Sequence, residues 1–223
     1  QDRVPKPKLL ATLRQLTDPA RRPTQPFQPI TEHVLAWQPE VALDLPADAL
    51  VTNLRRARRG AAPGPSGHTA ERVRLLLDDP GAVDAFARGA TRLARAQVPP
   101  AVARAVGLGR LVALRKPSGD VRGLVVGDFL RRLVARTIAQ HFASDFDAAC
   151  RPLQFALSTR AGSEALVYGL QLATELSATT TILSVGGVGA YDHMSRQSML
   201  QGLLDVPNAR AALPFARLFY GNG

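Results

Sequence analysis

The sequence predicts a helix-rich α+β fold, and three observations support this class. Apolar residues recur every three to four positions along several stretches, most regularly over residues 129–146, as in amphipathic helices. Two short runs rich in β-formers flank a turn at residues 116–120, and a third covers residues 180–185. Hydrophobic residues make up 46% of the 223 residues and charged residues 21%, which is ordinary for globular proteins and excludes wholesale disorder.

Proline is frequent in the first 45 residues, where it occurs at seven positions. Because proline lacks an amide donor, long helices are excluded in this region. We expect a proline-rich N-terminal arm over residues 1–45 with one short helix at residues 9–16. Trp37, the single tryptophan, is expected to dock this arm on the body.

Beyond the arm, further helices are predicted at residues 48–59, 69–77, 80–96, 129–146, 163–176, 195–204 and 211–220. Asp79 and Pro80 give one of them a clear start, because aspartate is a favoured N-cap and proline is favoured at the first helical position. Strands at residues 111–115 and 121–126 are predicted to form a hairpin around a Lys-Pro-Ser-Gly-Asp turn. The run TTILSV at residues 180–185 is predicted to be a separate strand.

The charge balance points to a polyanionic partner. Lys and Arg number 28 against 18 Asp and Glu, which gives a net charge of +10, and such basic proteins most often bind nucleic acid. All but three of the basic residues are arginine, whose fork suits phosphate, although a biased genome composition produces the same excess. The candidate nucleic-acid-binding residues are Arg55, Arg56, Arg58, Arg59, Arg131 and Arg132. The first four lie at a predicted helix end, where cations also favour the helix dipole, so a solvated helix end and a phosphate-binding patch both stay open.

Several other classes of site are excluded. The single cysteine, Cys150, cannot form an internal disulfide and is expected to pack as a small hydrophobe. The four histidines show no zinc-binding spacing, so no metal site is predicted. No uncharged stretch is long and apolar enough to span a membrane, and the polar N-terminus is not a signal peptide. The chain lacks an initiator methionine and stops after an apolar run, so we expect a fragment.

Four stretches resemble, in order, the N-terminal half of a reverse transcriptase domain of the non-LTR retrotransposon kind. AAPGPSGHT at residues 61–69 resembles a loop near the start of these domains, and LRKPSGDVRGLVVGDFLRRLVAR at residues 114–136 resembles the fingers signature. QFALSTRAGSEAL at residues 154–166 resembles the segment before the first palm strand. ILSVGGVGAYDHMSR at residues 182–196 resembles motif A.

The resemblance implies the N-terminal half of a right-hand polymerase, with the fingers hairpin, the first palm strand and an incomplete palm. Residues 46–107 would be the helical N-terminal part of the fingers, residues 108–150 the fingers hairpin and following helix, and residues 151–223 a truncated start of the palm. The family's activity is RNA-templated DNA synthesis. Its intact members use Mg²⁺, bind deoxynucleoside triphosphates, and hold RNA or an RNA–DNA hybrid.

The family's functional positions are only partly kept. Its lysine and arginine that face the incoming triphosphate match Lys116 and Arg122, and its aromatic residue under the nucleotide sugar matches Tyr191. Gly186 stands where motif A has its catalytic aspartate. Glycine has no side-chain oxygen to hold a metal, and two-metal phosphoryl transfer requires carboxylates. Motifs B and C are absent, so no intact catalytic residue is predicted, and Asp192 is expected to cap the following helix.

Three hypotheses follow. The chain is a truncated, inactive reverse-transcriptase-like domain, a non-catalytic basic module that binds nucleic acid, or a helical protein whose basicity reflects genome composition. Without the resemblance, Lys116 is an exposed turn residue, Arg122 a solvated strand residue and Tyr191 a core tyrosine. The sequence leaves the location inside the cell, nuclear or cytoplasmic, undecided.

Overall fold

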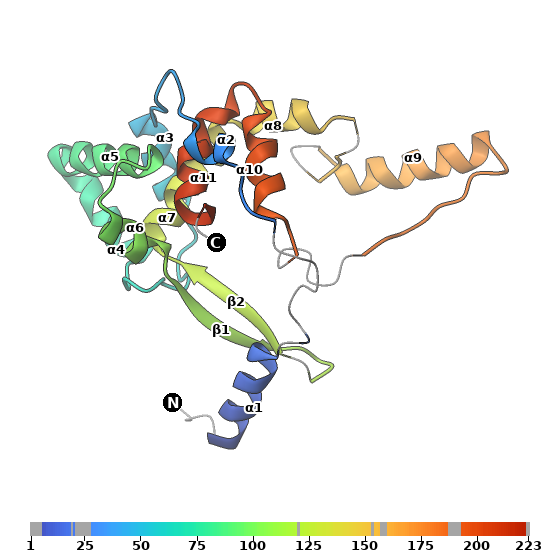
Figure 1. Cartoon of the computed structure of the whole chain (residues 1–223), viewed down its shortest axis with the longest axis horizontal. Coiled ribbons are helices and arrows are strands. Elements are labelled where there is room, and N and C mark those ends of the chain that lie inside the picture. Colours follow the sequence, from blue (N-terminus) through green and yellow to red (C-terminus); the bar gives the residue numbers. More distant parts are fainter. Residues whose placement is uncertain are drawn as a thin grey trace.

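The computed structural model describes residues 6–18, 20, 28–119, 121–152, 154–156, 160–186 and 193–221. These residues form an α+β fold with eleven α-helices, two short 3₁₀ helices and one two-stranded antiparallel sheet. Figure 1 shows a body of packed helices from which the β-hairpin and one helix project in different directions. The predicted helix-rich α+β class is confirmed.

The first half of the chain follows the predicted order closely. It contains α1 (Lys6–Thr17), α2 (Glu32–Ala36), α3 (Ala47–Arg56), α4 (Ala70–Arg74), η2 (Leu75–Asp78), α5 (Pro80–Ala94) and α6 (Pro100–Gly107). The Asp79 carboxylate accepts a hydrogen bond from the Gly81 amide at 2.9 Å, which confirms it as the N-cap of α5. The short helices α2 and α6 were not predicted from the sequence.

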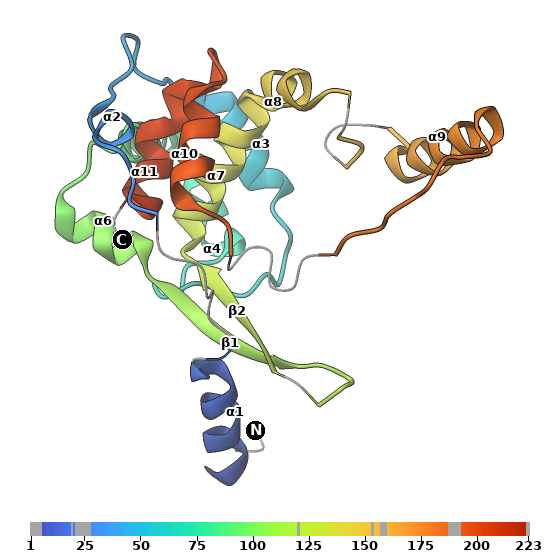
Figure 2. The same ribbon diagram turned by 45° about the vertical axis from the view of Figure 1, so that its right-hand side comes forward.

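The hairpin consists of β1 (Gly109–Arg115) and β2 (Val121–Gly127), paired from Arg115 opposite Val121 to Gly109 opposite Gly127. Its turn closes with a hydrogen bond from the Gly119 amide to the Lys116 carbonyl at 2.9 Å. Gly119 has a φ of +88°, a conformation that residues with a Cβ rarely adopt. The predicted hairpin is therefore confirmed. Helix α1 packs against β2 (Figure 2).

The main core forms where α3 and α5 pack on α7 (Phe129–His141). Its most buried side chains include Leu50, Leu54, Leu93 and Val134. One polar pair lies inside this core: the Asn53 Nδ2 donates to Thr137 Oγ1 at 3.1 Å, and that hydroxyl donates to the Leu133 carbonyl at 2.9 Å. Because each buried polar group has a partner, the pair fixes the α3–α7 packing without an uncompensated desolvation cost.

The long helix predicted over residues 129–146 is divided in two. Helix α7 ends at His141, and α8 (Ala143–Cys150) begins after Phe142, whose φ of −101° and ψ of 16° depart from helical values. Phe142 is buried, and its ring makes edge-to-face contacts with His141 and Phe146. Periodicity misses this break because the apolar spacing continues through it. Cys150 at the end of α8 is exposed, so its predicted packing as a hydrophobe is wrong.

The last helices return to the body. Helix α10 (Arg196–Leu204), η3 (Ala209–Ala212) and α11 (Leu213–Tyr220) pack together, α10 also contacting α2 and α11 contacting α5 and α6. They build a second apolar cluster around Val34, Leu200, Leu204 and Leu213, against which Trp37 packs. The N-cap of α10 is Ser195, whose Oγ accepts a hydrogen bond from the Ser198 amide at 3.2 Å. The expected cap, Asp192, lies outside the described residues.

Arg217 joins the N-terminal arm to α11. Its guanidinium donates to the carbonyls of Val34 and Trp37 at 3.0 and 2.8 Å, and partial burial lowers its pKa. The expected docking of the arm through Trp37 is therefore confirmed, and Arg217 supplies its polar component.

The region expected to begin the palm contains no strand among its described residues. Helix α9 (Gly162–Leu176) has no buried residue and projects from the body (Figure 1). Residues 180–186 form no regular secondary structure, and Leu183 and Val185 are each 83% exposed. The predicted first palm strand at residues 180–185 is wrong, because a strand needs a neighbouring strand for its backbone hydrogen bonds and none pairs with this segment in the described chain. None of the described helices combines the length and apolarity needed to cross a bilayer.

Candidate nucleic-acid interface

Four arginines gather at the C-terminal end of α3. Leu50, Asn53 and Leu54 face the core, so Arg55 and Arg56 point outward from α3. The helix predicted to reach residue 59 ends at Arg56, so Arg58 and Arg59 lie in the turn that follows, and all four arginines are exposed. Within the described part of the chain, no hydrogen bond or ion pair engages any of their guanidinium groups. We call these four residues the arginine cluster. Its positive charges are available to a partner in solution.

A fifth arginine, Arg74 of α4, holds the backbone beneath the arginine cluster. Its guanidinium donates to the Leu54 carbonyl at 3.1 Å, to the Arg55 carbonyl at 2.9 Å and to the Ala57 carbonyl. The last carbonyls of a helix have no partner within the helix, and here Arg74 supplies one. The cluster's own side chains are therefore not needed as C-terminal caps of α3.

Glu71 fixes the turn that follows the cluster. Its Oε1 accepts a hydrogen bond from the Gly60 amide at 2.7 Å. The pKa of Glu71 is lowered, chiefly by the hydrogen bond from its own backbone amide, with further contributions from Gly60, the Thr69 hydroxyl and the charge of Arg74. The carboxylate thus stays ionised and keeps the end of the cluster close to α4.

The loop at residues 61–67 is held against the junction between β2 and α7. A Cβ on Gly64 would lie 2.6 Å from both the Asp128 Cα and the Gly127 carbonyl oxygen, so only glycine permits this approach. Arg132 of α7 donates to the Ala62 carbonyl at 2.8 Å, while the Asp128 carboxylate caps α7 through the Leu130 amide at 3.0 Å. The loop therefore connects the arginine cluster to the base of the hairpin.

Arg131 and Arg132, both candidates for nucleic-acid binding, are half-buried and already engaged within the protein. Arg131 donates to the Gly107 carbonyl at 3.2 Å, and its guanidinium carbon lies 4.1 Å from the centre of the Phe219 ring. Arg132 is occupied by the Ala62 contact described above. Both side chains have structural roles, which the sequence could not indicate because Phe219 is far away along the chain.

The hairpin has two different faces. Because directly opposite residues share a face and neighbours along a strand alternate, the register places Arg110 and Arg122 on one face with Leu114 and Leu124. All four of these side chains are exposed. The other face is contacted by α1, where Leu16 lies 3.2 Å from the position of a Gly123 Cβ. On the face with Arg110 and Arg122, Val112 and Val126 are half-buried while both arginines are exposed.

The remaining predicted positions are not assembled into a site. Lys116 is exposed in the hairpin turn and is not one of the residues paired between β1 and β2. Gly186 is exposed, with no atom within 4 Å of the position its Cβ would take, and Tyr191 lies outside the described residues. No group of three or more histidine, cysteine or carboxylate side chains is placed to hold a metal ion in the residues described.

Two hollows in the body are lined mainly by apolar residues. One, of about 370 Å³, lies among α5, α6 and α7, and the other, of about 620 Å³, lies among α8, α10 and α11. Neither contains a residue of the arginine cluster. The candidate interface is therefore the exposed surface formed by the arginine cluster and lies outside both hollows.

The sequence analysis named the arginine cluster and Arg122 as candidates, but it did not name Arg110 or Arg74. Arg110 could have been found by extending the hairpin one pair beyond residue 111, which places it on the face of Arg122. The role of Arg74 depends on how α4 packs against α3 and has no local signal. Comparison of the chain with protein-family models, with curated proteins and with solved structures finds no match.

Proposed function

We propose that this chain is a non-catalytic, reverse-transcriptase-like fingers segment that binds nucleic acid through the phosphate backbone. The observation that carries the proposal is the arginine cluster, in which four adjacent guanidinium groups are exposed and have no partner in the described chain. The net charge of +10 supports a polyanionic partner. Arginine forks bind phosphate oxygens in pairs, and such contacts carry no sequence information, so we expect little sequence preference.

The alternative interpretation is that these arginines only stabilise the end of α3. Cations near a helix C-terminus contribute about 0.3–1 kcal/mol each at exposed positions. That role is partly taken by Arg74, which already donates to three carbonyls at this end. A purely structural role would also leave the arginines without influence on the salt dependence of binding.

The hairpin extends the proposed interface. Arg122 lies where the resemblance implies a triphosphate contact, and Arg110 shares its face. We propose RNA or an RNA–DNA hybrid as the partner, with the duplex backbone on the arginine cluster and the hairpin face as a second contact. Gly186 supplies no carboxylate for a metal ion. We therefore propose no polymerisation step for this chain.

The test compares binding of an RNA–DNA hybrid by two variants that each lose four positive charges. In the first, Arg55, Arg56, Arg58 and Arg59 are replaced by alanine. In the matched control, alanine replaces Arg88, Arg92, Arg104 and Arg210, which are also exposed and lack a side-chain partner among the described residues. Binding is measured over a range of salt concentrations.

Each phosphate contact contributes about 0.9 to the slope of log affinity against log salt on duplex DNA, so loss of the cluster should reduce the slope by at most about 3.6. The control variant should lower affinity less and largely keep the slope. Equal effects of the two variants would show that only total charge matters and would refute the assigned interface. Absence of salt-dependent binding by the unaltered chain would refute the function itself.

A further inference from the structure

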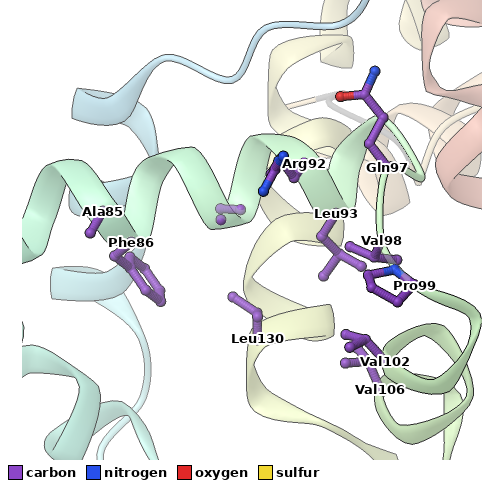
Figure 3. A pocket seen from close by; sticks show the side chains of 12 residues that line it. Ala85, Phe86, Arg92, Leu93, Gln97, Val98, Pro99, Val102, Val106 and Leu130 are labelled. Atoms are coloured by element: carbon purple, nitrogen blue, oxygen red, sulfur yellow. The ribbon is translucent and has the colours of Figure 1, made fainter.

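The hollow of about 370 Å³ beside α5 has the composition of a ligand pocket. Figure 3 shows Phe86 and Leu93 of α5, Val102 and Val106 of α6 and Leu130 of α7 converging around it. Val102 is 44% exposed, so this apolar wall is open to solvent. Small-molecule sites are typically concave, mostly apolar and about 300–1,000 Å³ in volume, and this hollow falls at the lower end of that range.

Gly89 is an exposed residue at the hollow. It lies within α5, where glycine is among the least favourable residues, and it lines the hollow. A Cβ at this position would meet no atom within 4 Å, and the backbone is not in a conformation that requires glycine. Packing therefore does not explain the residue. Because Gly89 lines the hollow, we expect a larger side chain at this position to occupy part of it.

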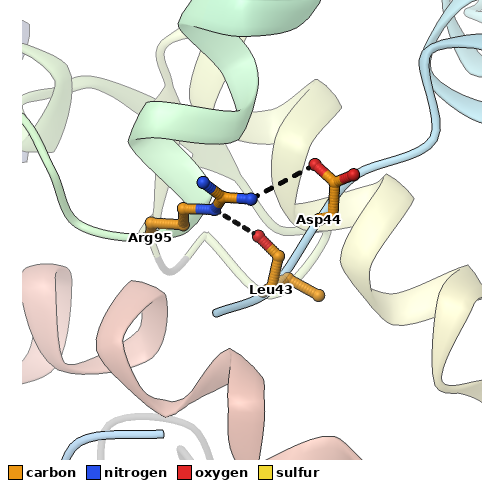
Figure 4. A network of polar contacts seen from close by, with 3 residues as sticks. All are labelled: Leu43, Asp44 and Arg95. Carbon is orange, nitrogen blue, oxygen red and sulfur yellow. Dashed lines mark hydrogen bonds and ion pairs between the residues drawn. The ribbon is translucent and has the colours of Figure 1, made fainter. Parts of the chain in front are cut away.

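The polar side chains at the hollow are cationic or neutral. Its lining includes Arg92 and Gln97 but no acidic residue. The Arg92 guanidinium has no hydrogen-bonding or ionic partner in the described chain. Arg95, one turn further along, is different: it is held by the Leu43 carbonyl at 2.6 Å and by Asp44 at 3.3 Å (Figure 4). Arg92 is thus the free cation at the edge of an apolar hollow.

We propose that this hollow binds an amphipathic monoanion, with a medium-length hydrocarbon chain in the apolar part and a carboxylate against Arg92. The apolar lining favours the chain through burial from water. The guanidinium favours a carboxylate through charge-assisted hydrogen bonds. The volume suits a chain of medium length rather than a long-chain lipid. The hollow is separate from the arginine cluster, since no residue of the cluster lines the hollow.

The test uses decanoate as the probe and decanol as its uncharged counterpart, with binding measured by calorimetric titration of the full chain. The unaltered chain should bind decanoate more tightly than decanol. Arg92→Gln should weaken decanoate binding about tenfold, the loss expected for one charge-assisted contact, and should leave decanol binding unchanged. Equal weakening of both ligands, or no binding of decanoate by the unaltered chain, would overturn the proposal.

A second variant tests the hollow itself. Gly89→Leu adds a side chain where there is free space and a better helix former, so the protein should unfold at the same or a higher temperature while decanoate binding is lost. Gly169→Leu in α9 is the matched control, because its added side chain also meets nothing within 4 Å and lies outside the hollow. Retained binding in Gly89→Leu, or equal loss in both variants, would contradict the assigned site.

Discussion

Replacing Gly64 by alanine should detach the loop at residues 61–67 from the junction between β2 and α7. The added Cβ would lie 2.6 Å from the Asp128 Cα and from the Gly127 carbonyl oxygen, whereas carbon atoms normally pack at about 3.5–4.0 Å. The conflicting atoms belong to the backbone and cannot rotate away. The loop must therefore move by about 1 Å, judged from that difference in contact distance.

The size of the effect follows from two contributions. Overpacking of this kind costs about 1–3 kcal/mol. Movement of the loop would also weaken the hydrogen bond from Arg132 to the Ala62 carbonyl, and hydrogen bonds of charged groups contribute about 1.5–3 kcal/mol. Partial loss of the second contribution gives an expected destabilisation of about 2–4 kcal/mol, a large part of the about 5–15 kcal/mol by which domains are stable.

Urea unfolding followed by circular dichroism measures this change as a lower midpoint with an unchanged slope. Gly202→Ala in α10 is the control, since its Cβ would meet no atom within 4 Å, and it should raise the free energy of unfolding by about 0.5–1 kcal/mol. If Gly64→Ala is as stable as the unaltered chain, the loop is not held as described. The loop would then not join the arginine cluster to the base of the hairpin.

Three further predictions concern other elements. Asp79→Ala should lower the free energy of unfolding by about 1 kcal/mol through loss of the α5 cap, and an unchanged urea midpoint would contradict that role. Since the pKa of Glu71 is lowered in the folded protein, its stabilising contribution should be present above its ordinary pKa and disappear as pH falls through the lowered value. The NMR signal of the Gly60 amide should shift over that range and not in Glu71→Gln. Finally, neither the chain nor Gly186→Asp should extend a primer with Mg²⁺ or Mn²⁺, because one carboxylate cannot hold two metal ions; extension by either would refute the assignment.

Local chemistry made much of the fold predictable. The turn at Lys116–Gly119 and the flanking β-formers specify the hairpin, and Asp79 followed by Pro80 specifies the start of α5. These signals act between near neighbours and need no tertiary partner. The same reasoning placed Arg55 and Arg56 at a helix end, because Leu50 and Leu54 define the opposite face, whereas Arg58 and Arg59 lie in the turn after that end.

The features that the sequence did not reveal depend on the tertiary structure. The apolar run at residues 180–185 has strand propensity, but propensity reflects packing and pairing that this segment does not have. The break at Phe142 interrupts an apolar spacing that continues through it, and its side chain is buried in the main core. Arg131 and Arg132 look like surface cations in the sequence, and only the positions of Phe219 and the Ala62 carbonyl show that they are engaged.

Arginine-specific chemical modification tests whether the arginine cluster binds the phosphate backbone. Phenylglyoxal reacts with exposed guanidinium groups, and mass spectrometry of the modified chain identifies each site with and without saturating RNA–DNA hybrid. We expect the hybrid to protect Arg55, Arg56, Arg58, Arg59 and Arg122, while Arg88 and Arg210 stay reactive. Continued reactivity of the arginine cluster in the saturated complex would contradict the claim that it binds the phosphate backbone.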